Sequence, residues 1–160
     1  MILNFNQINH EEFMKEALIE ADLAGKRGDR PIGCVIVHNG EIVAKGANSI
    51  ETSNNNVAHA EINAIHSNPG YIREHARESI LYTTVEPCVM CLPTIVMANI
   101  RNIVFAIEDK YMAMDHFIQS NPYLKKRVHN YLGNVLKDES IEILQKYSKE
   151  TASLILHGKI

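Results

Sequence analysis

The first part of the chain combines a helical pattern with continuous apolar runs. Residues 11–24 carry apolar side chains three and four positions apart, which predicts an amphipathic helix that Gly25 ends. Residues 31–37 form an apolar run, as expected for a strand that is covered on both faces. Asn39-Gly40 then favours a tight hairpin, so residues 41–46 are predicted to return as the partner strand.

A polar loop at residues 49–56 separates this hairpin from a segment in which helices and strands alternate. Pro69-Gly70 interrupts the first of these helices, and β-branched and aromatic residues are typical of the strands. The expected order is a helix at 58–66, a strand at 80–86, a helix that Pro87 opens and that runs to about residue 98, and a strand at 103–107. A strand, a helix and a strand in this order imply a parallel pair with a right-handed crossover.

The last third of the chain has a weaker pattern. Residues 122–136 are expected to be helical, residues 141–144 to form an edge strand and residues 149–157 to form a terminal helix. Together these elements predict an α/β fold, a three-layer α/β/α sandwich with helices on both faces of the sheet. Since no repeat, low-complexity tract or linker divides the sequence, residues 1–160 are interpreted as one domain with its core at about residues 10–110.

Composition and charge narrow the class of protein. With 160 residues, of which 46% are hydrophobic and 22% charged, the chain is typical of one globular domain. Its formal net charge of −3 argues against a protein that mainly coats duplex DNA. Residues 1–10 lack the features of a secretory signal, and no apolar run approaches the length of a membrane span. We therefore expect a cytoplasmic protein without membrane contact.

Two of the three cysteines, Cys88 and Cys91, lie close together directly after a predicted strand. Three positions apart in a helical turn, the two sulfurs share one face. Pro87 suits the first helical position, and the N-terminus of a helix lowers the pKa of nearby thiols. The pattern is typical of metal sites and equally of thioredoxin-like redox sites, so the cysteine pair alone leaves both interpretations open.

His59 favours the metal, because one imidazole and two thiolates leave the fourth tetrahedral position of a zinc ion open, as in catalytic zinc sites. Glu61 follows two residues later, and both side chains converge only where the preceding loop enters the helix. A carboxylate near the zinc but not bound to it can take a proton from water that the zinc acidifies, and return it to a ring nitrogen and a departing amine. The alternative for Glu61 is an exposed residue that interacts with the helix dipole.

His59-Ala60-Glu61 followed by Pro87-Cys88-Val89-Met90-Cys91 resembles the signature of the zinc-dependent cytidine/deoxycytidylate deaminase superfamily. Pro31-Ile32-Gly33 and Leu81-Tyr82-Thr83-Thr84 resemble the branch of tRNA adenosine deaminases, guanine deaminases and yeast-type cytosine deaminases. The likeness spans about residues 10–110 and implies a mixed sheet of roughly five strands. It also implies one Zn²⁺ per chain on His59, Cys88 and Cys91, proton transfer by Glu61, and a homodimer.

The same resemblance indicates where a substrate would lie. Asn48 falls where the family places an Asn that hydrogen-bonds the substrate ring, and Asp109 falls where related enzymes have a substrate-contacting acid. Backbone groups around Ala60 and Glu86 complete the expected substrate contacts, and residues 111–160 are expected to supply a substrate wall and covering helices. The alternatives are a turn residue for Asn48 and a helix cap for Asp109.

Three departures from the tRNA enzymes bear on the substrate. Residues 55–58 read Asn-Asn-Val-Ala rather than Asp-Pro-Thr-Ala, residues 110–114 lack a Gly-rich stretch, and residues 151–160 lack an arginine-rich, aromatic helix. We therefore expect hydrolytic deamination of a free nucleobase or nucleoside, of the guanine or cytosine type, with release of ammonia. The alternatives are a deaminase of the wobble adenosine with tRNA as partner, and a non-catalytic zinc module or Cys-x-x-Cys redox protein.

Overall fold

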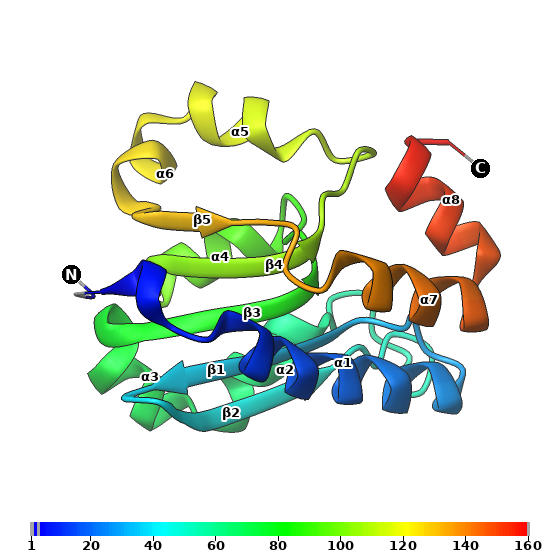
Figure 1. Cartoon of the computed structure of the whole chain (residues 1–160), viewed down its shortest axis with the longest axis horizontal. Helices are drawn as coiled ribbons and strands as arrows, with labels where there is room; N and C mark the ends of the chain where they lie inside the picture. Colours follow the sequence, from blue (N-terminus) through cyan, green and yellow to red (C-terminus); the bar gives the residue numbers. More distant parts are fainter. Residues whose placement is uncertain (1, 3, 160) are drawn as a thin grey trace.

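A mixed sheet organises the computed structural model, which describes residue 2 and residues 4–159 (Figure 1). The strands are β1 Gly33–His38, β2 Glu41–Ala47, β3 Ser79–Val85, β4 Asn102–Ile107 and β5 Asn130–Leu132. Their order in the sheet is β2-β1-β3-β4-β5. Strand β1 is antiparallel to β2 and β3, whereas β4 is parallel to β3 and β5. The predicted parallel pair, β3 and β4, is therefore confirmed.

The hairpin between β1 and β2 turns at the Asn-Gly dipeptide, as predicted. Asn39 has φ 51° and Gly40 has φ 78°, and both values lie in the left-handed region. A two-residue type I′ turn needs positive φ at both central positions, which asparagine and glycine tolerate best.

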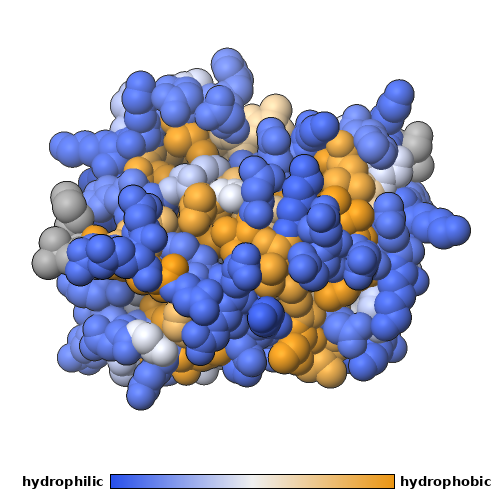
Figure 2. Space-filling model, in the orientation of Figure 1, coloured by the Kyte–Doolittle hydropathy of each residue, from blue (hydrophilic) through white to orange (hydrophobic). Residues whose placement is uncertain are grey.

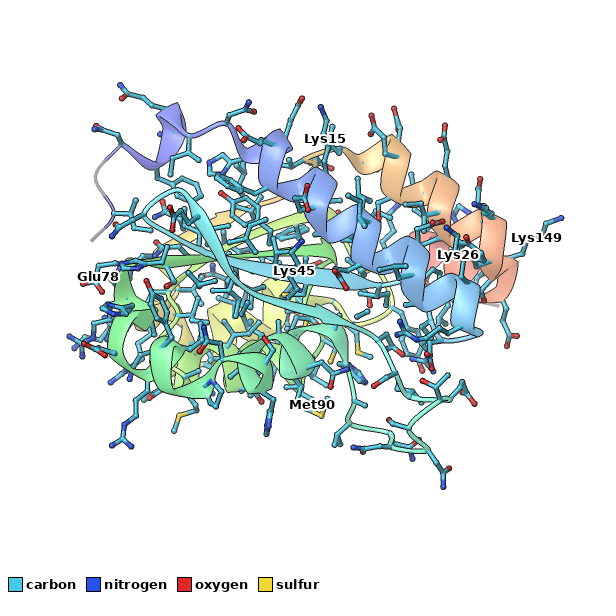
Figure 3. The ribbon with its side chains drawn as sticks, turned by 90° about the horizontal axis from the view of Figure 1, so that it is seen from below. Lys15, Lys26, Lys45, Glu78, Met90 and Lys149 are labelled. Atoms are coloured by element: carbon cyan, nitrogen blue, oxygen red, sulfur yellow. The ribbon has the colours of Figure 1, made fainter. Side chains whose placement is uncertain are left out.

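Helices cover both faces of the sheet. They are α1 His10–Arg27, α2 Ala60–Ser67, α3 Pro69–His75, α4 Cys91–Met97, α5 Met114–Ser120, α6 Pro122–Arg127, α7 Lys137–Tyr147 and α8 Lys149–His157, with 3-10 helices at Phe5–Gln7 and Ala76–Glu78. Buried side chains of α1, α7 and α8 share one face, and those of α2 to α6 share the other. Figure 3 shows α1 and α2 on opposite sides of the strands. The predicted α/β/α sandwich is confirmed.

The surface over α1 and α7 is mainly hydrophilic, with hydrophobic residues gathered between the polar ones (Figure 2). Ile19 and Leu23 of α1 are among the exposed apolar side chains. In the described part of the chain, no helix has both the length and the hydrophobicity that crossing a membrane requires.

The prediction of one helix over residues 122–136 was wrong. Helix α6 ends at Arg127, and the next residue, Val128, is extended. The backbone N–H groups of His129 and Asn130 then donate to the carbonyl oxygen of Arg101, just before β4. These bonds draw the chain onto the edge of the sheet, where it forms β5. Edge pairing with a distant strand is a tertiary effect that local periodicity does not report.

Residues 141–144 were predicted as an edge strand, and the structure places them inside α7. Leu144 is fully buried against the sheet, and Ile141 and Ile143 pack partly against the same cluster. A run of four residues fits a buried strand or one turn of a helix, and periodicity alone does not separate them. The terminal helix predicted at residues 149–157 is confirmed as α8.

Gly25 does not end α1, contrary to the prediction. The helix continues to Arg27 and ends at Gly28, whose φ of 89° is left-handed. Gly25 lies against the ring of Tyr147 on α7, so close that a Cβ atom would overlap the ring. The glycine therefore permits close helix packing and does not mark a helix end.

Gly46 on β2 brings α2 close to the sheet in a similar way. A Cβ atom at this position would overlap the backbone oxygen of Ala60 and the backbone nitrogen of Ala64, both in α2. Because backbone atoms cannot move aside as a flexible side chain can, a larger residue must displace the helix.

We predict that Gly46→Ala lowers the midpoint of thermal unfolding. Overpacking costs about 1–3 kcal/mol, and each kcal/mol shifts the midpoint of a domain of this size by roughly 2–4 °C. Calorimetry of purified protein measures the change. Gly70→Ala is the matched control, because a Cβ atom there meets nothing within 4 Å. Equal midpoints for the two variants would contradict the prediction.

Candidate active site

The three predicted metal ligands come from the starts of two helices. His59 has extended backbone angles, φ −74° and ψ 155°, and directly precedes α2. Cys88 lies in the turn after β3, and Cys91 is the first residue of α4. Helix α4 therefore begins at Cys91 and not at Pro87, as was predicted. Met90, between the cysteines, lies on the side of the sheet that carries α2 (Figure 3).

The structure brings these three side chains together. His59 Nδ1 lies 3.6 Å from Cys88 Sγ and 3.4 Å from Cys91 Sγ. One donor atom from each residue lies within 4.8 Å of the others. The backbone N–H of Cys91 also points at Cys88 Sγ, at 3.4 Å. The spacing of His59, Cys88 and Cys91 along the chain thus becomes one cluster of nitrogen and sulfur donors.

The electrostatics of the cluster favour a thiolate. A hydrogen bond from the Cys91 thiol, helped by one from His59 and opposed by burial, lowers the pKa of Cys88 to about 4. The same hydrogen bond, together with burial, raises the pKa of the Cys91 thiol. Hydrogen bonding to Cys88 raises the pKa of His59. One proton is thus shared among donors of which at least one sulfur is anionic, and a cation would replace that proton.

The donor set fits zinc. Imidazole nitrogen and thiolate sulfur are the ligands that zinc prefers, and catalytic sites use three protein ligands. Among the described residues, no fourth His, Cys, Asp or Glu joins the group. Three ligands leave one coordination position to a water molecule or a substrate.

Glu61 lies in the first turn of α2, with only 4% of its surface exposed. The hydroxyl of Thr83 on β3 donates to Glu61 Oε1 at 3.2 Å. Burial raises the pKa of Glu61 above its ordinary value. The alternative of an exposed, dipole-stabilised Glu61 is therefore wrong. A buried carboxyl that holds a proton more readily than usual suits general acid and base chemistry.

A cavity of about 810 Å³ opens beside this cluster. His59, Glu61 and Cys88 line it together with the four residues predicted to contact substrate, Asn48, Ala60, Glu86 and Asp109. The wall that faces them includes Thr151, Leu154 and Ile155 of α8. Every predicted site residue except Cys91 therefore lines one chamber.

Asn48 has a structural role that the sequence analysis gave as its alternative. Its Oδ1 accepts the backbone N–H of Ile50 at 3.1 Å, which forms a local turn. Its carbonyl oxygen accepts a hydrogen bond from the Arg27 guanidinium at 2.9 Å. No hydrogen bond from the Asn48 amide nitrogen is found among the described residues, so a substrate contact by that nitrogen stays a prediction.

Glu86 and Asp109 hold the wall of the cavity in place. Glu86 accepts the Tyr131 hydroxyl at 2.8 Å and the backbone N–H of Asp109 at 2.9 Å. Asp109 Oδ1 accepts the N–H groups of Tyr111 and Met112, at 2.9 and 3.2 Å. Burial raises the pKa of both carboxyls. The capping role of Asp109 is observed, and the substrate contacts of both residues stay predictions.

Sequence analysis missed Asp29, which anchors the loop that carries Asn48. Its carboxylate accepts the N–H groups of Glu51 and Thr52, both at 3.0 Å, and the Thr52 hydroxyl at 2.8 Å. Burial alone would raise its pKa, but hydrogen bonds from Thr52 and the pairing with Arg27 lower it. Nothing in the sequence links Asp29 to Thr52, because their contact arises only when α1 packs on the sheet.

Residues 7–107 match the family described as the cytidine and deoxycytidylate deaminase zinc-binding region. The chain belongs to this family. It is therefore a zinc-dependent hydrolytic deaminase, with zinc as cofactor and with His59, Cys88 and Cys91 as a possible zinc site. Membership argues against the redox and non-catalytic interpretations.

Relatives in the family share much of the chain. A tRNA-specific adenosine deaminase of Streptococcus pyogenes serotype M1 is 35% identical over 142 residues, which are 86% of this chain and 82% of the relative. A chloroplastic tRNA(adenine(34)) deaminase of Arabidopsis thaliana is 37% identical over 106 residues, and this chain spans 8% of its length.

Solved structures agree on the fold. A tRNA:A34 deaminase, studied for A-to-I editing at the wobble position of transfer RNA, has a TM-score of 0.71 and 34% identity, with coverage of 83% of this chain and 99% of the other. Guanine deaminase from Bacillus subtilis has a TM-score of 0.60 and 38% identity, with coverage of 69% and 71%.

These comparisons correct the expected substrate. The preference for a free guanine- or cytosine-type compound was wrong, because the curated relatives that match over most of both chains are named tRNA-specific adenosine deaminases. The structure covered to 99% is a tRNA:A34 deaminase. The preference rested on residues 55–58, 110–114 and 151–160, which lie in loops and near the last helix. Such segments vary more readily than the elements that carry the metal site.

We predict that Thr83→Val lowers kcat by about 10-fold or more, because a hydrogen bond to a charged group is worth about 1.5–3 kcal/mol. The valine keeps the shape of the threonine but cannot donate to Glu61. Steady-state deamination kinetics and zinc analysis check this. Thr83→Ser restores the donor and should recover most of kcat, whereas equal kcat for the valine and serine variants would contradict the assignment.

Proposed function

We propose that this deaminase acts on adenosine in the anticodon loop of a tRNA and converts it to inosine. The observation that carries the proposal is the likeness to a tRNA-specific adenosine deaminase over 86% of this chain and 82% of the relative. That likeness extends over more residues than the zinc-binding region at 7–107. It therefore includes segments outside the shared chemical motif, which help to determine the substrate.

In this proposal His59, Cys88 and Cys91 hold the zinc, which supplies the positive charge that makes a water molecule acidic at neutral pH. Glu61 accepts a proton from that water on its carboxylate. It then delivers protons to N1 of the adenine ring and to the departing amine. The overall reaction replaces the C6 amino group with oxygen, consumes one water and releases one ammonia.

Burial of Glu61 supports this role. A carboxyl with 4% exposure pays little to be neutral and therefore passes a proton on readily. The hydroxyl of Thr83 keeps Oε1 in a fixed direction. Asn48, Ala60, Glu86 and Asp109 are proposed to shape the base pocket, since all four line the cavity.

We further propose that residues 1–160 act as one deaminase domain in the cytoplasm, with residues 111–160 supplying the substrate wall. Side chains of α8 in the cavity lining support the second part. The homodimer also stays a prediction, since the family resemblance alone suggests it. Light scattering at working concentration should give twice the chain mass of 18.0 kDa, and a monomer mass would reject it.

We predict that the purified protein releases ammonia from an anticodon stem-loop with adenosine at the wobble position. Glu61→Gln is the matched control, because it keeps the shape of the side chain and removes its base. It should retain zinc and lose activity by orders of magnitude. Ammonia release and inosine in the digested RNA are measured together. Turnover of free guanine with an unchanged stem-loop would overturn the proposal.

A further inference from the structure

Tyr111 lies at the cavity with its side chain exposed. It lines the same chamber as His59 and Glu61, and 56% of its surface is accessible. A large apolar ring in water at the edge of a catalytic chamber loses free energy that a flat ligand can recover. This position therefore differs from that of an ordinary surface tyrosine.

The other tyrosines of the chain already have partners. Their hydroxyl groups each contact a neighbouring side chain, at Tyr71, Tyr82, Tyr123, Tyr131 and Tyr147. Within the described residues, no comparable hydroxyl bond, ring pair or cation contact is found for Tyr111. Both faces of its ring are thus available to a ligand.

The backbone that carries Tyr111 is fixed. Its N–H donates to Asp109 Oδ1 at 2.9 Å, and Asp109 is buried at the end of β4. The N–H of the preceding residue, Lys110, donates to the carbonyl oxygen of Ile155 on α8 at 3.0 Å. The segment is therefore anchored to the sheet on one side and to α8 on the other. An aromatic ring on a fixed backbone loses little conformational freedom when a ligand stacks on it.

Arg30 supplies a cation to the same chamber. It lines the cavity, is exposed, and follows the end of α1 by three residues. In the described chain it makes no ion pair within 4.0 Å, whereas Arg27 is paired with Asp29. A flipped nucleotide in RNA is held by stacking of bases on aromatic rings and by contacts to the phosphates. Tyr111 and Arg30 provide one of each.

The size of the chamber leaves room for more than one base. Its volume of about 810 Å³ lies near the upper end of the roughly 300–1,000 Å³ found for sites that enclose whole small-molecule ligands. The cluster of His59, Cys88 and Glu61 occupies one part of the lining, and Tyr111 lies in another.

We propose that Tyr111 is the stacking platform for a base next to the target adenosine, and that Arg30 contacts a phosphate of the same single-stranded segment. The inference rests on the proposed function, because it assigns the recognition of the RNA that the function requires. A free nucleobase has neither a neighbouring base nor a phosphate, so it would use neither residue.

Loss of the ring should weaken RNA binding and leave the chemical step intact. Tyr111→Ala is expected to raise KM for the anticodon stem-loop by about 5- to 150-fold, the range for removal of one base–aromatic stack, with kcat changed less than 3-fold. Tyr111→Phe keeps the ring and should behave as the wild type. Tyr123→Ala is the matched control, because this tyrosine of α6 is 43% exposed and does not line the cavity. Its KM should stay unchanged.

Direct binding separates this inference from the proposed function. The Glu61→Gln protein binds a fluorescent stem-loop without turnover, and anisotropy is compared with that of the Glu61→Gln, Tyr111→Ala double variant. Weaker binding by the double variant supports the stacking role even if the wild type deaminates no RNA, an outcome that would overturn only the proposed function. Equal binding overturns the stacking role and leaves the function standing. An absence of binding by either protein overturns both.

The phosphate contact has its own measurement. Arg30→Gln should reduce the slope of log Kd against log salt by about one for the stem-loop. Lys15→Gln is the control, since Lys15 lies on the outer side of α1 and points away from the sheet (Figure 3). Equal slopes for the two variants would overturn the contact.

Discussion

One imidazole nitrogen and two sulfurs lie within 4.8 Å of one another although 29 residues separate the first two donors in the chain. This convergence requires the start of α2, the end of β3 and the start of α4 to meet at one edge of the sheet. The antiparallel pairing of β1 with β3 and the close approach of α2 to β2 at Gly46 create that meeting point. The rest of the structure is arranged around this edge.

The same edge concentrates negative charge. The Cys88 thiol has a pKa of about 4, and Glu61, Glu86 and Asp109 are buried nearby in the cavity lining. Each carboxylate accepts at least one hydrogen bond from the protein, which offsets part of the cost of burying it. A divalent cation on the sulfurs would offset more of this charge. The chemistry that zinc supplies and the stability of this edge are therefore coupled.

The metal site was predictable from sequence because its residues are close together in two short motifs. His59 and Glu61 are two positions apart, Cys88 and Cys91 are three apart, and the loop-to-helix transition at His59 resolves their geometry. The α/β/α layers followed from apolar runs and helical spacing. These signals are local, so one sequence suffices to read them.

The parts that failed depend on contacts between distant residues. Strand β5 exists because residues after α6 bond to Arg101, and Gly25 lies within α1 because Tyr147 packs on it. The assignment of substrate failed for a related reason. Tyr111 and Arg30 are 81 positions apart in the sequence, and only the fold places both at one chamber.

The contact between Gly25 and Tyr147 has a consequence for how this chamber can be altered. Tyr147 belongs to the cavity lining, and its ring leaves no space for even a methyl group on Gly25. Any larger residue there would tilt the ring and change the outline of the chamber while the metal ligands stayed in position. Position 25 is thus a remote adjustment point, at which selectivity can be redesigned without disturbing the reacting atoms.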